Sequence, residues 1–174
     1  MDSARTSISS DPAYEASEAN EIEPSDIYVD AEGDWYNQGI KIFREEIVGL
    51  FLRNLHLLPD GAFFIELRQN RCSLKAEDTP FVIAGVDRVE IEGSKEEILL
   101  RLRHLPAAEP LDPTTLYVGQ DNVLYCRIHG GEMPARFSRP AYYQFAEWIR
   151  EDSLTGEFYV ELGGRRYSIP VELS

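Results

Sequence analysis

The chain has 174 residues, of which 43% are hydrophobic, and this composition is typical of one soluble globular domain. Asp and Glu outnumber Lys and Arg by 31 to 17, and the net charge of −14 disfavours binding to nucleic acid or to an anionic membrane surface. The sequence has no apolar run of about 18 residues and no signal-peptide pattern, so we predict a cytoplasmic protein without a membrane span.

Residues 1–25 form an acidic segment rich in serine and alanine, with a single basic residue, Arg5. Such a segment has too few large apolar side chains to bury, so we predict a disordered tail. The alternative is that the tail packs on the domain or on a neighbouring molecule.

Three hairpins are predicted in addition to those of the sequence repeat described below. Residues 27–29 and 35–42 alternate and form the first, which leads into a helix. Residues 86–92 and 98–103 form a middle hairpin, and residues 116–118 and 123–128 form the third. Between the last two, residues 106–115 contain three prolines, which predicts an irregular connection and a hinge between two halves.

The chain is organised around a repeat, because residues 40–78 match residues 135–173 at a shift of 95 without a gap. The identical pairs are Arg44/Arg139, Gly61/Gly156, Phe63/Phe158, Glu66/Glu161, Leu67/Leu162, Arg71/Arg166, Ser73/Ser168 and Glu77/Glu172. Most of them fall in a stretch of alternating residues. This indicates that one ancestral unit was duplicated.

Each copy begins with a pattern of apolar residues at helical spacing. The predicted buried stripes are Ile47, Leu50, Phe51, Leu55 and Leu58 in the first copy, and Tyr142, Phe145, Ala146 and Ile149 in the second. Glu45 and Glu46 suit the start of the first helix, while Ser138 can cap the second and Pro140 is tolerated in its first turn.

A hairpin follows each helix. Gly163 and Gly164 supply a two-residue turn, and residues 68–69 stand in the same place in the first copy. The resulting register sets Glu66 opposite Arg71 and, equally, Glu161 opposite Arg166. We interpret both as cross-strand ion pairs on the outer face; the alternative is a pair of repeated binding sites.

The predicted fold class is α+β, with two repeated strand-helix-hairpin motifs (ββαββ-like) packed as one pseudo-twofold unit with an extra middle hairpin. The predicted division is a tail at 1–25, a first half with the middle hairpin at 26–105, a Pro-rich connection at 106–115 and a second half at 116–174. A unit of about 50 residues buries too little surface to be stable alone, so we expect one shared core.

The sequence contains no recognisable catalytic or metal-binding motif, and we predict that the protein binds no cofactor and no metal. The three histidines are far apart, and the two cysteines, Cys72 and Cys126, fit neither a disulfide scaffold nor a zinc site. Cys72 is predicted to be a buried core thiol. Cys126 lies near Arg127 and His129 and is the one candidate nucleophile.

The second copy also carries aromatic residues that could form a surface. Tyr143 and Trp148 lie off the predicted stripe of their helix, and Tyr159 lies on the outer face of the hairpin. Aromatic residues at helical spacing are often core, but they are also common at partner interfaces. The candidate residues for binding a ligand or partner are therefore Tyr143, Trp148, Tyr159 and the repeated Arg44 and Arg139.

Several short motifs resemble a bacterial family known as domain of unknown function 1285. They are Gly33-Asp34-Trp35, Gly39 to Ile42, Asp60-Gly61, Glu77 to Phe81, Tyr125 to Ile128, Ala135 to Arg139 and Tyr142-Tyr143. The resemblance spans about residues 26–173. It implies a fold of repeated helix-and-strand motifs and a suggested part in signal transduction, and it brings no catalytic residues. The chain departs from the family at residues 67–70.

Three hypotheses of function follow. The first is a non-enzymatic module that binds a protein partner or small molecule in a groove between the two repeat units. The second is a small hydrolase whose site is assembled from distant residues, with Cys126 or His129 as the residue to test. The third is a scaffold subunit whose aromatic face seals a homodimer, with Trp148 as the residue to test.

Overall fold

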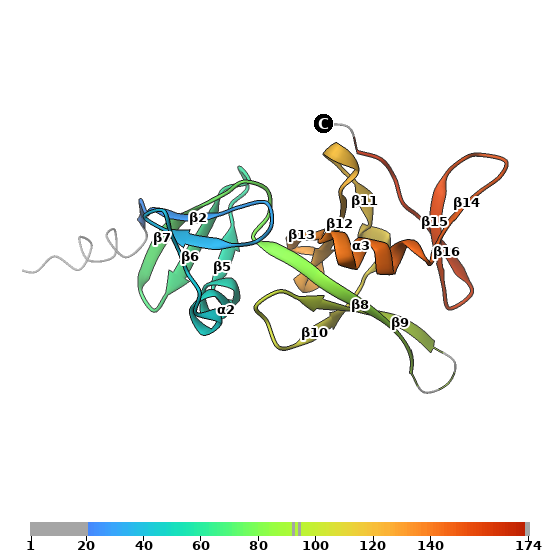
Figure 1. The fold of residues 1–174 in the computed structure, drawn as a ribbon, viewed down its shortest axis with the longest axis horizontal. Coiled ribbons are helices and arrows are strands. Elements are labelled where there is room, and N and C mark those ends of the chain that lie inside the picture. Colours follow the sequence, from blue (N-terminus) through green and yellow to red (C-terminus); the bar gives the residue numbers. More distant parts are fainter. Residues whose placement is uncertain (1–20, 92, 94, 173–174) are drawn as a thin grey trace, which may run out of the picture.

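The computed structural model describes residues 21–91, 93 and 95–172. These residues form a mostly β protein with two helices, an α+β fold as predicted. Figure 1 shows two units side by side, joined where strand β8 begins. Residues 1–20 of the predicted tail lie outside the described residues.

The first unit contains one helix and a seven-stranded sheet. Its elements are β1 (Ile22–Glu23), β2 (Ile27–Val29), β3 (Trp35–Asn37), β4 (Ile40–Lys41), α2 (Glu45–Arg53), β5 (Leu55–Leu57), β6 (Phe63–Leu67) and β7 (Asn70–Ala76). The strand order is β4-β3-β2-β7-β6-β5, and β1 also pairs with β7. The prediction of a disordered tail is therefore wrong for Ile22 and Glu23, because β7 offers them hydrogen-bonding partners.

The second unit repeats this order of elements. It contains β11 (Tyr117–Val118), β12 (Leu124–Ile128), β13 (Met133–Phe137), α3 (Arg139–Ala146), β14 (Ile149–Glu151), β15 (Phe158–Leu162) and β16 (Arg165–Ser168). Both units are thus an antiparallel three-stranded meander, a helix and a second such meander.

The two units also close in the same way. In each, the last segment runs parallel to the first strand of the first meander, which is β2 in the first unit and β11 in the second. The Glu77 amide donates to the carbonyl of Val29 at 2.9 Å, and the Glu172 amide donates to that of Val118 at 2.8 Å. Glu77 and Glu172 are one of the identical pairs of the sequence repeat, so the duplication is visible in the backbone.

The predicted hairpin register is confirmed in both copies. Glu66 faces Arg71 in the first hairpin, and Glu161 faces Arg166 in the second. The turn residue Gly163 has φ of +56°, a conformation that glycine adopts without strain.

Only the first of the two predicted ion pairs forms. Arg71 Nε lies 3.2 Å from a carboxylate oxygen of Glu66. The second prediction is wrong, because Arg166 instead reaches Asp152 at 3.6 Å and lies over the ring of Tyr159 at 4.6 Å. The loop between β14 and β15 supplies Asp152, and the sequence pattern did not place that loop beside the hairpin.

Both helices are shorter than predicted, and the residues that each one buries differ in part from the predicted stripe. Helix α2 buries Val48, Gly49 and Leu52, while Leu50 is 42% exposed. Helix α3 buries Ala141 and Phe145, so the predicted burial of Phe145 is confirmed, but Tyr142 of the predicted stripe is 37% exposed. The residues that follow each helix, Leu55–Leu57 and Ile149–Glu151, form a third strand against the predicted hairpin. This pairing satisfies the edge of the hairpin and ends the helix early.

The start of α3 is as predicted. The Ser138 hydroxyl accepts a hydrogen bond from the Ala141 amide at 3.3 Å, and Pro140 lies in the first turn.

The middle hairpin belongs to the second unit, which corrects the predicted division of the chain. It consists of β8 (Phe81–Ile91) and β9 (Lys95–Leu102), followed by β10 (Ala108–Pro110). Strand β8 pairs in parallel with β13, so the second sheet has the order β10-β9-β8-β13-β12-β11. Residues 106–115 are not a hinge between the halves, because β10 pairs with β9. The chain crosses from one unit to the other between β7 and β8.

The buried apolar residues of both units form one contiguous cluster, which includes Trp35, Ile65, Ile98, Phe145 and Val160. The prediction of a shared core is confirmed. Within the described part of the chain, neither helix is long or apolar enough to cross a membrane.

Candidate functional site

A groove of about 1150 Å³ lies where the two units meet. The first unit contributes the β2–β3 turn and the end of β7, and the second unit contributes β11, β12, β13 and the start of α3. The groove is lined by residues that include Ala31, Glu32, Glu77, Asp78, Tyr117, Asp121, Tyr125, Arg136, Arg139, Tyr142, Tyr143 and Glu172.

The wall from the first unit is held by two carboxylates. Asp30 accepts hydrogen bonds from the amides of Glu32 at 3.0 Å and Asp34 at 2.8 Å, which fixes the turn. Glu77 accepts from the Tyr28 hydroxyl at 2.9 Å and from the Ala31 amide at 3.1 Å. The turn therefore presents Ala31 and Glu32 to the groove in a fixed position.

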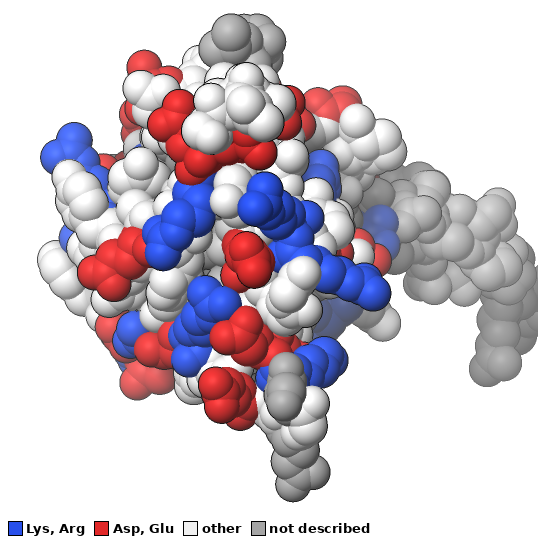
Figure 2. All heavy atoms as spheres, turned by 90° about the vertical axis from the view of Figure 1, so that its right-hand side faces the viewer, with Lys and Arg blue, Asp and Glu red and all other residues white. Residues whose placement is uncertain are grey.

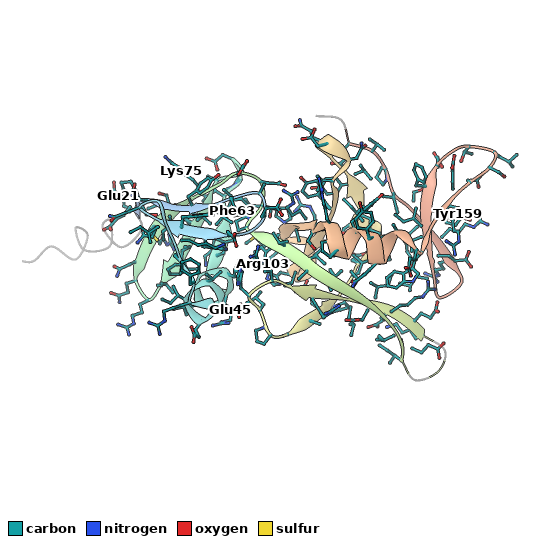
Figure 3. The ribbon with its side chains drawn as sticks, in the orientation of Figure 1. Glu21, Glu45, Phe63, Lys75, Arg103 and Tyr159 are labelled. Carbon is teal, nitrogen blue, oxygen red and sulfur yellow. The ribbon has the colours of Figure 1, made fainter. Side chains whose placement is uncertain are left out.

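Arg103 ties this turn to the second unit. Its guanidinium donates to the Glu32 carbonyl and to the Asp34 carboxylate, each at 2.5 Å, and it lies at the junction of the units (Figure 3). Burial alone would raise the pKa of Asp34, but hydrogen bonds and charge from Lys41 and Arg103 outweigh it and lower that pKa. Asp34 thus stays ionised and keeps both cations.

The backbone at the same turn comes close to β8. Gly33 has φ of +81°, and a Cβ atom there would lie 2.6 Å from Cγ2 of Val82. Only glycine combines this conformation with this approach. The Gly33-Asp34 dipeptide therefore serves the docking of the two units.

The floor of the groove is a hydrogen-bonded group from both units. Asp78 accepts from the Tyr125 hydroxyl at 2.7 Å and from Arg136 at 3.0 Å. Burial raises the pKa of Tyr125, and the Asp78 carboxylate raises it further. Tyr125 therefore stays protonated, and Tyr117 stacks on it with ring centroids 5.2 Å apart.

The groove carries an excess of negative charge. Five carboxylates line it against the guanidiniums of Arg136 and Arg139. Asp78 is paired with Arg136, and Glu77 is bonded within its own unit. The other three are Glu32, Asp121 and Glu172, whose side chains form no hydrogen bond or ion pair with any described residue. These three charges are open to a binding partner.

The structure brings two of the five predicted site residues into the groove. Tyr143 is 67% exposed and lines it, and so does Arg139 at the first residue of α3. The other three lie elsewhere. Arg44 is exposed at the N-cap position of α2, and Tyr159 lies on β15, at the end of the second unit far from the first (Figure 3).

Trp148, the remaining predicted residue, is half-buried. Its ring packs edge-on against Phe145 at 5.8 Å, with the Arg88 guanidinium 6.0 Å away. The ring therefore packs against a buried residue of α3 and remains partly exposed.

Sequence reasoning missed Glu32, Asp78, Asp121, Glu172 and Tyr117 as groove residues. The identity of Glu77 and Glu172 in the two copies was a usable signal, because both fall at the end of their repeat. The hydrogen bonds of Asp78 and Glu32 across the junction join residues 47 to 71 positions apart, which no local pattern reports.

The candidate nucleophile does not have a reactive setting. Cys126 is 0% exposed, and burial raises the pKa of its thiol. His129 is paired with Glu109 at 2.8 Å, and neither cysteine nor histidine lines the groove. Cys72 is partly buried rather than fully buried. In residues 21–91, 93 and 95–172, no group of three or more His, Cys, Asp or Glu side chains is arranged to hold a metal ion.

No protein-family model and no curated protein matches the chain. The structure is similar to that of a DUF1285 family protein from Silicibacter pomeroyi, with a TM-score of 0.71 and 19% sequence identity over 86% of this chain and 82% of that one. It is also similar to that of a DUF1285 family protein from Shewanella baltica, with a TM-score of 0.59 and 19% identity over 71% of this chain and 91% of that one. The match to this family over most of the chain agrees with the motifs noted in the sequence, and at this identity it establishes the fold.

Proposed function

We propose that this protein is a non-enzymatic binding module whose groove receives a positively charged segment of a protein partner. The observation that carries the proposal is a set of three carboxylates, Glu32, Asp121 and Glu172, that have no hydrogen-bond or ion-pair partner among the described residues and line a groove with exposed tyrosines. The two structural relatives are named only as members of a family of unknown function, so the proposal rests on the groove itself.

The size of the groove favours a protein segment over a small molecule. Small-molecule sites are typically about 300 to 1,000 Å³, mostly apolar and closed around their ligand. The groove is larger, at about 1150 Å³, and its walls are rich in charged groups. Tyrosines such as Tyr142 and Tyr143 at its rim are of the type enriched where proteins meet.

The charge of the groove favours a basic partner. A cleft lined by one sign of charge attracts the opposite sign and speeds its association. Tyrosine rings can in addition contact a Lys or Arg side chain through cation–π interactions. Other parts of the surface are not single-signed, since Figure 2 shows basic and acidic side chains interspersed at the end of the second unit.

Three further expectations from the sequence belong to this proposal. They are a part in signal transduction, a cytoplasmic location and a pseudo-twofold relation between the two units across the groove. The equal order of elements and the equal strand register support the last of these.

The test is a measurement of peptide binding with charge-matched variants. The groove variant combines Glu32→Gln, Asp121→Asn and Glu172→Gln, and the control combines Asp26→Asn, Glu46→Gln and Glu90→Gln at exposed sites outside the groove. Both variants have the same net charge. The probes are a fluorescent Lys- and Arg-rich peptide and an acidic peptide of the same length, followed by fluorescence anisotropy.

We expect the basic peptide to bind the unmodified protein and the control alike, and the groove variant roughly tenfold more weakly. Exposed charge pairs contribute up to about 1 kcal/mol each, which sets this scale. Equal weakening in both variants would assign binding to net charge alone and overturn the proposal. So would equal affinity for the basic and the acidic peptide.

A further inference from the structure

A second hollow lies within the second unit and adjoins the groove. It has a volume of about 620 Å³, and the two cavities share Asn122, Leu124 and Tyr142. Its other walls come from helix α3, the β14–β15 strands and the segment that follows β16. The hollow is a separate feature from the charged part of the groove.

The lining of this hollow is predominantly apolar. Six of its residues are Val118, Ala146, Ile149, Phe158, Ile169 and Val171. The two charged groups in the lining, Arg150 and Glu151, have opposite charges, so they add no net charge. This composition distinguishes it from the acidic groove.

The corresponding residues of the first unit are more deeply buried. Phe63 and Phe158 occupy one register position in the repeat, yet Phe63 is 9% exposed and Phe158 is 47% exposed. Val29 is fully buried, whereas its counterpart Val118 is only partly buried. The two units therefore share the same elements, but equivalent side chains are less buried in the second unit.

Side-chain size accounts for part of this difference. In the first unit Phe51 projects from α2 and packs on Trp35, with ring centroids 5.9 Å apart. The shift of 95 aligns Phe51 with Ala146, which lines the hollow. An alanine leaves unfilled the volume that an aromatic ring would occupy.

Backbone chemistry accounts for the rest. In the first unit β7 runs on to Ala76 and pairs along β2. In the second unit the shift of 95 places Pro170 at the position of Lys75, β16 ends at Ser168, and the parallel contact is reduced to a bridge between Val118 and Val171. Proline has no amide proton to donate to a ladder. Figure 1 shows the β14–β16 sheet standing apart from strands β11–β13.

We propose that this hollow binds an uncharged, largely apolar small molecule. Its volume lies within the range of about 300 to 1,000 Å³ typical of small-molecule sites, and its walls are apolar as such sites require. Phe158 and Val171, which are 47% and 57% exposed, would leave water when the ligand enters, and burial of apolar surface is favourable. We expect a neutral ligand because Arg150 and Glu151 have opposite charges, which leaves the lining without net charge.

The test uses Nile red, a neutral apolar dye that fluoresces when it leaves water, with the full chain. The variant Ala146→Phe restores the ring of the first unit and fills the hollow. The matched control is Ala108→Phe, at an exposed position on β10 outside the hollow. A second variant, Phe158→Gln, removes apolar surface at a half-exposed position, where folding is expected to tolerate it. Thermal unfolding verifies that each variant is folded.

We expect saturable dye binding to the unmodified protein and to Ala108→Phe, and at least tenfold weaker binding to Phe158→Gln and to Ala146→Phe. The groove variant with three neutralised carboxylates should bind the dye normally, which separates this proposal from the function proposed above. Absence of saturable binding to the unmodified protein would overturn it, and so would unchanged affinity in Phe158→Gln. Sedimentation is measured in parallel; a dimer that dissociates on adding dye would mean that a second copy of the chain covers the hollow, and would also overturn it.

Discussion

The two repeat units have the same order of elements and the same hairpin register, but only in the first do the two meanders join in one sheet. In the first unit β7 joins β2 and the meanders form one sheet. In the second unit the last meander, β14–β15–β16, is a separate three-stranded sheet. The comparison teaches that a duplicated sequence pattern preserves local structure while the packing between elements diverges.

The inserted strands β8–β10 contribute to this divergence. Helix α3 packs on β8, which has no counterpart in the first unit, and buries Ala141 and Phe145. The shift of 95 aligns these residues with Glu46 and Leu50 of α2, which are exposed. Each helix buries the face that contacts apolar side chains of its own unit. The hydrophobic effect depends on the apolar area removed from water, and not on the position of a residue in the sequence repeat.

The largest expected difference in stability between the two units concerns Phe63 and Phe158. We predict that Phe63→Ala lowers the free energy of unfolding by about 3 to 5 kcal/mol, because a buried ring leaves a cavity. Phe158→Ala should cost about 1 kcal/mol, because its ring is already half in water. Denaturant unfolding of both variants measures the difference. Equal losses would mean that the second unit is as closed as the first.

A smaller effect is expected at the hairpin turns. Gly163 has φ of +56°, and Arg68, at the matching position of the first unit, has φ of +60°. Gly163→Val should lower the stability by about 1 to 3 kcal/mol, because a β-branched residue is strained at positive φ.

The reciprocal change tests the same turn from the other side. Arg68→Gly relieves a strained conformation, so we predict a gain of about 1 kcal/mol or less. The midpoint of thermal unfolding reports both variants. A stabilised Gly163→Val protein would show that the turn conformation is wrong.

The smallest effect sharpens the comparison at the two Glu/Arg positions. A double-mutant cycle on Glu66→Gln and Arg71→Gln should give a coupling energy of about 0.2 to 1 kcal/mol, since this pair lies at 3.2 Å. The cycle on Glu161→Gln and Arg166→Gln should give a coupling near zero, because Arg166 is paired with Asp152. Urea unfolding at low salt is the measurement. A larger coupling in the second copy would contradict the observed pairing.

Part of the groove was open to sequence reasoning. The repeat predicted two units with a groove between them, and two of its residues, Tyr143 and Arg139, were candidates from their place on the helix. Glu32, Asp121 and Tyr117 were not, because they belong to turns and short strands that meet only across the junction of the units.

The sequence by itself determined the duplicated order of strands and helix, the hairpin register and the cap at Ser138, because alternation, turn glycines and capping act over a few neighbouring residues. Only the tertiary structure decided that β8 and β9 join the second unit, that β16 ends at Ser168 and that the Phe158 side chain stays half-exposed. These outcomes depend on which residues, distant in the sequence, pack on the same apolar surface or pair with the same strand edge. Such contacts produce no periodic pattern in the sequence.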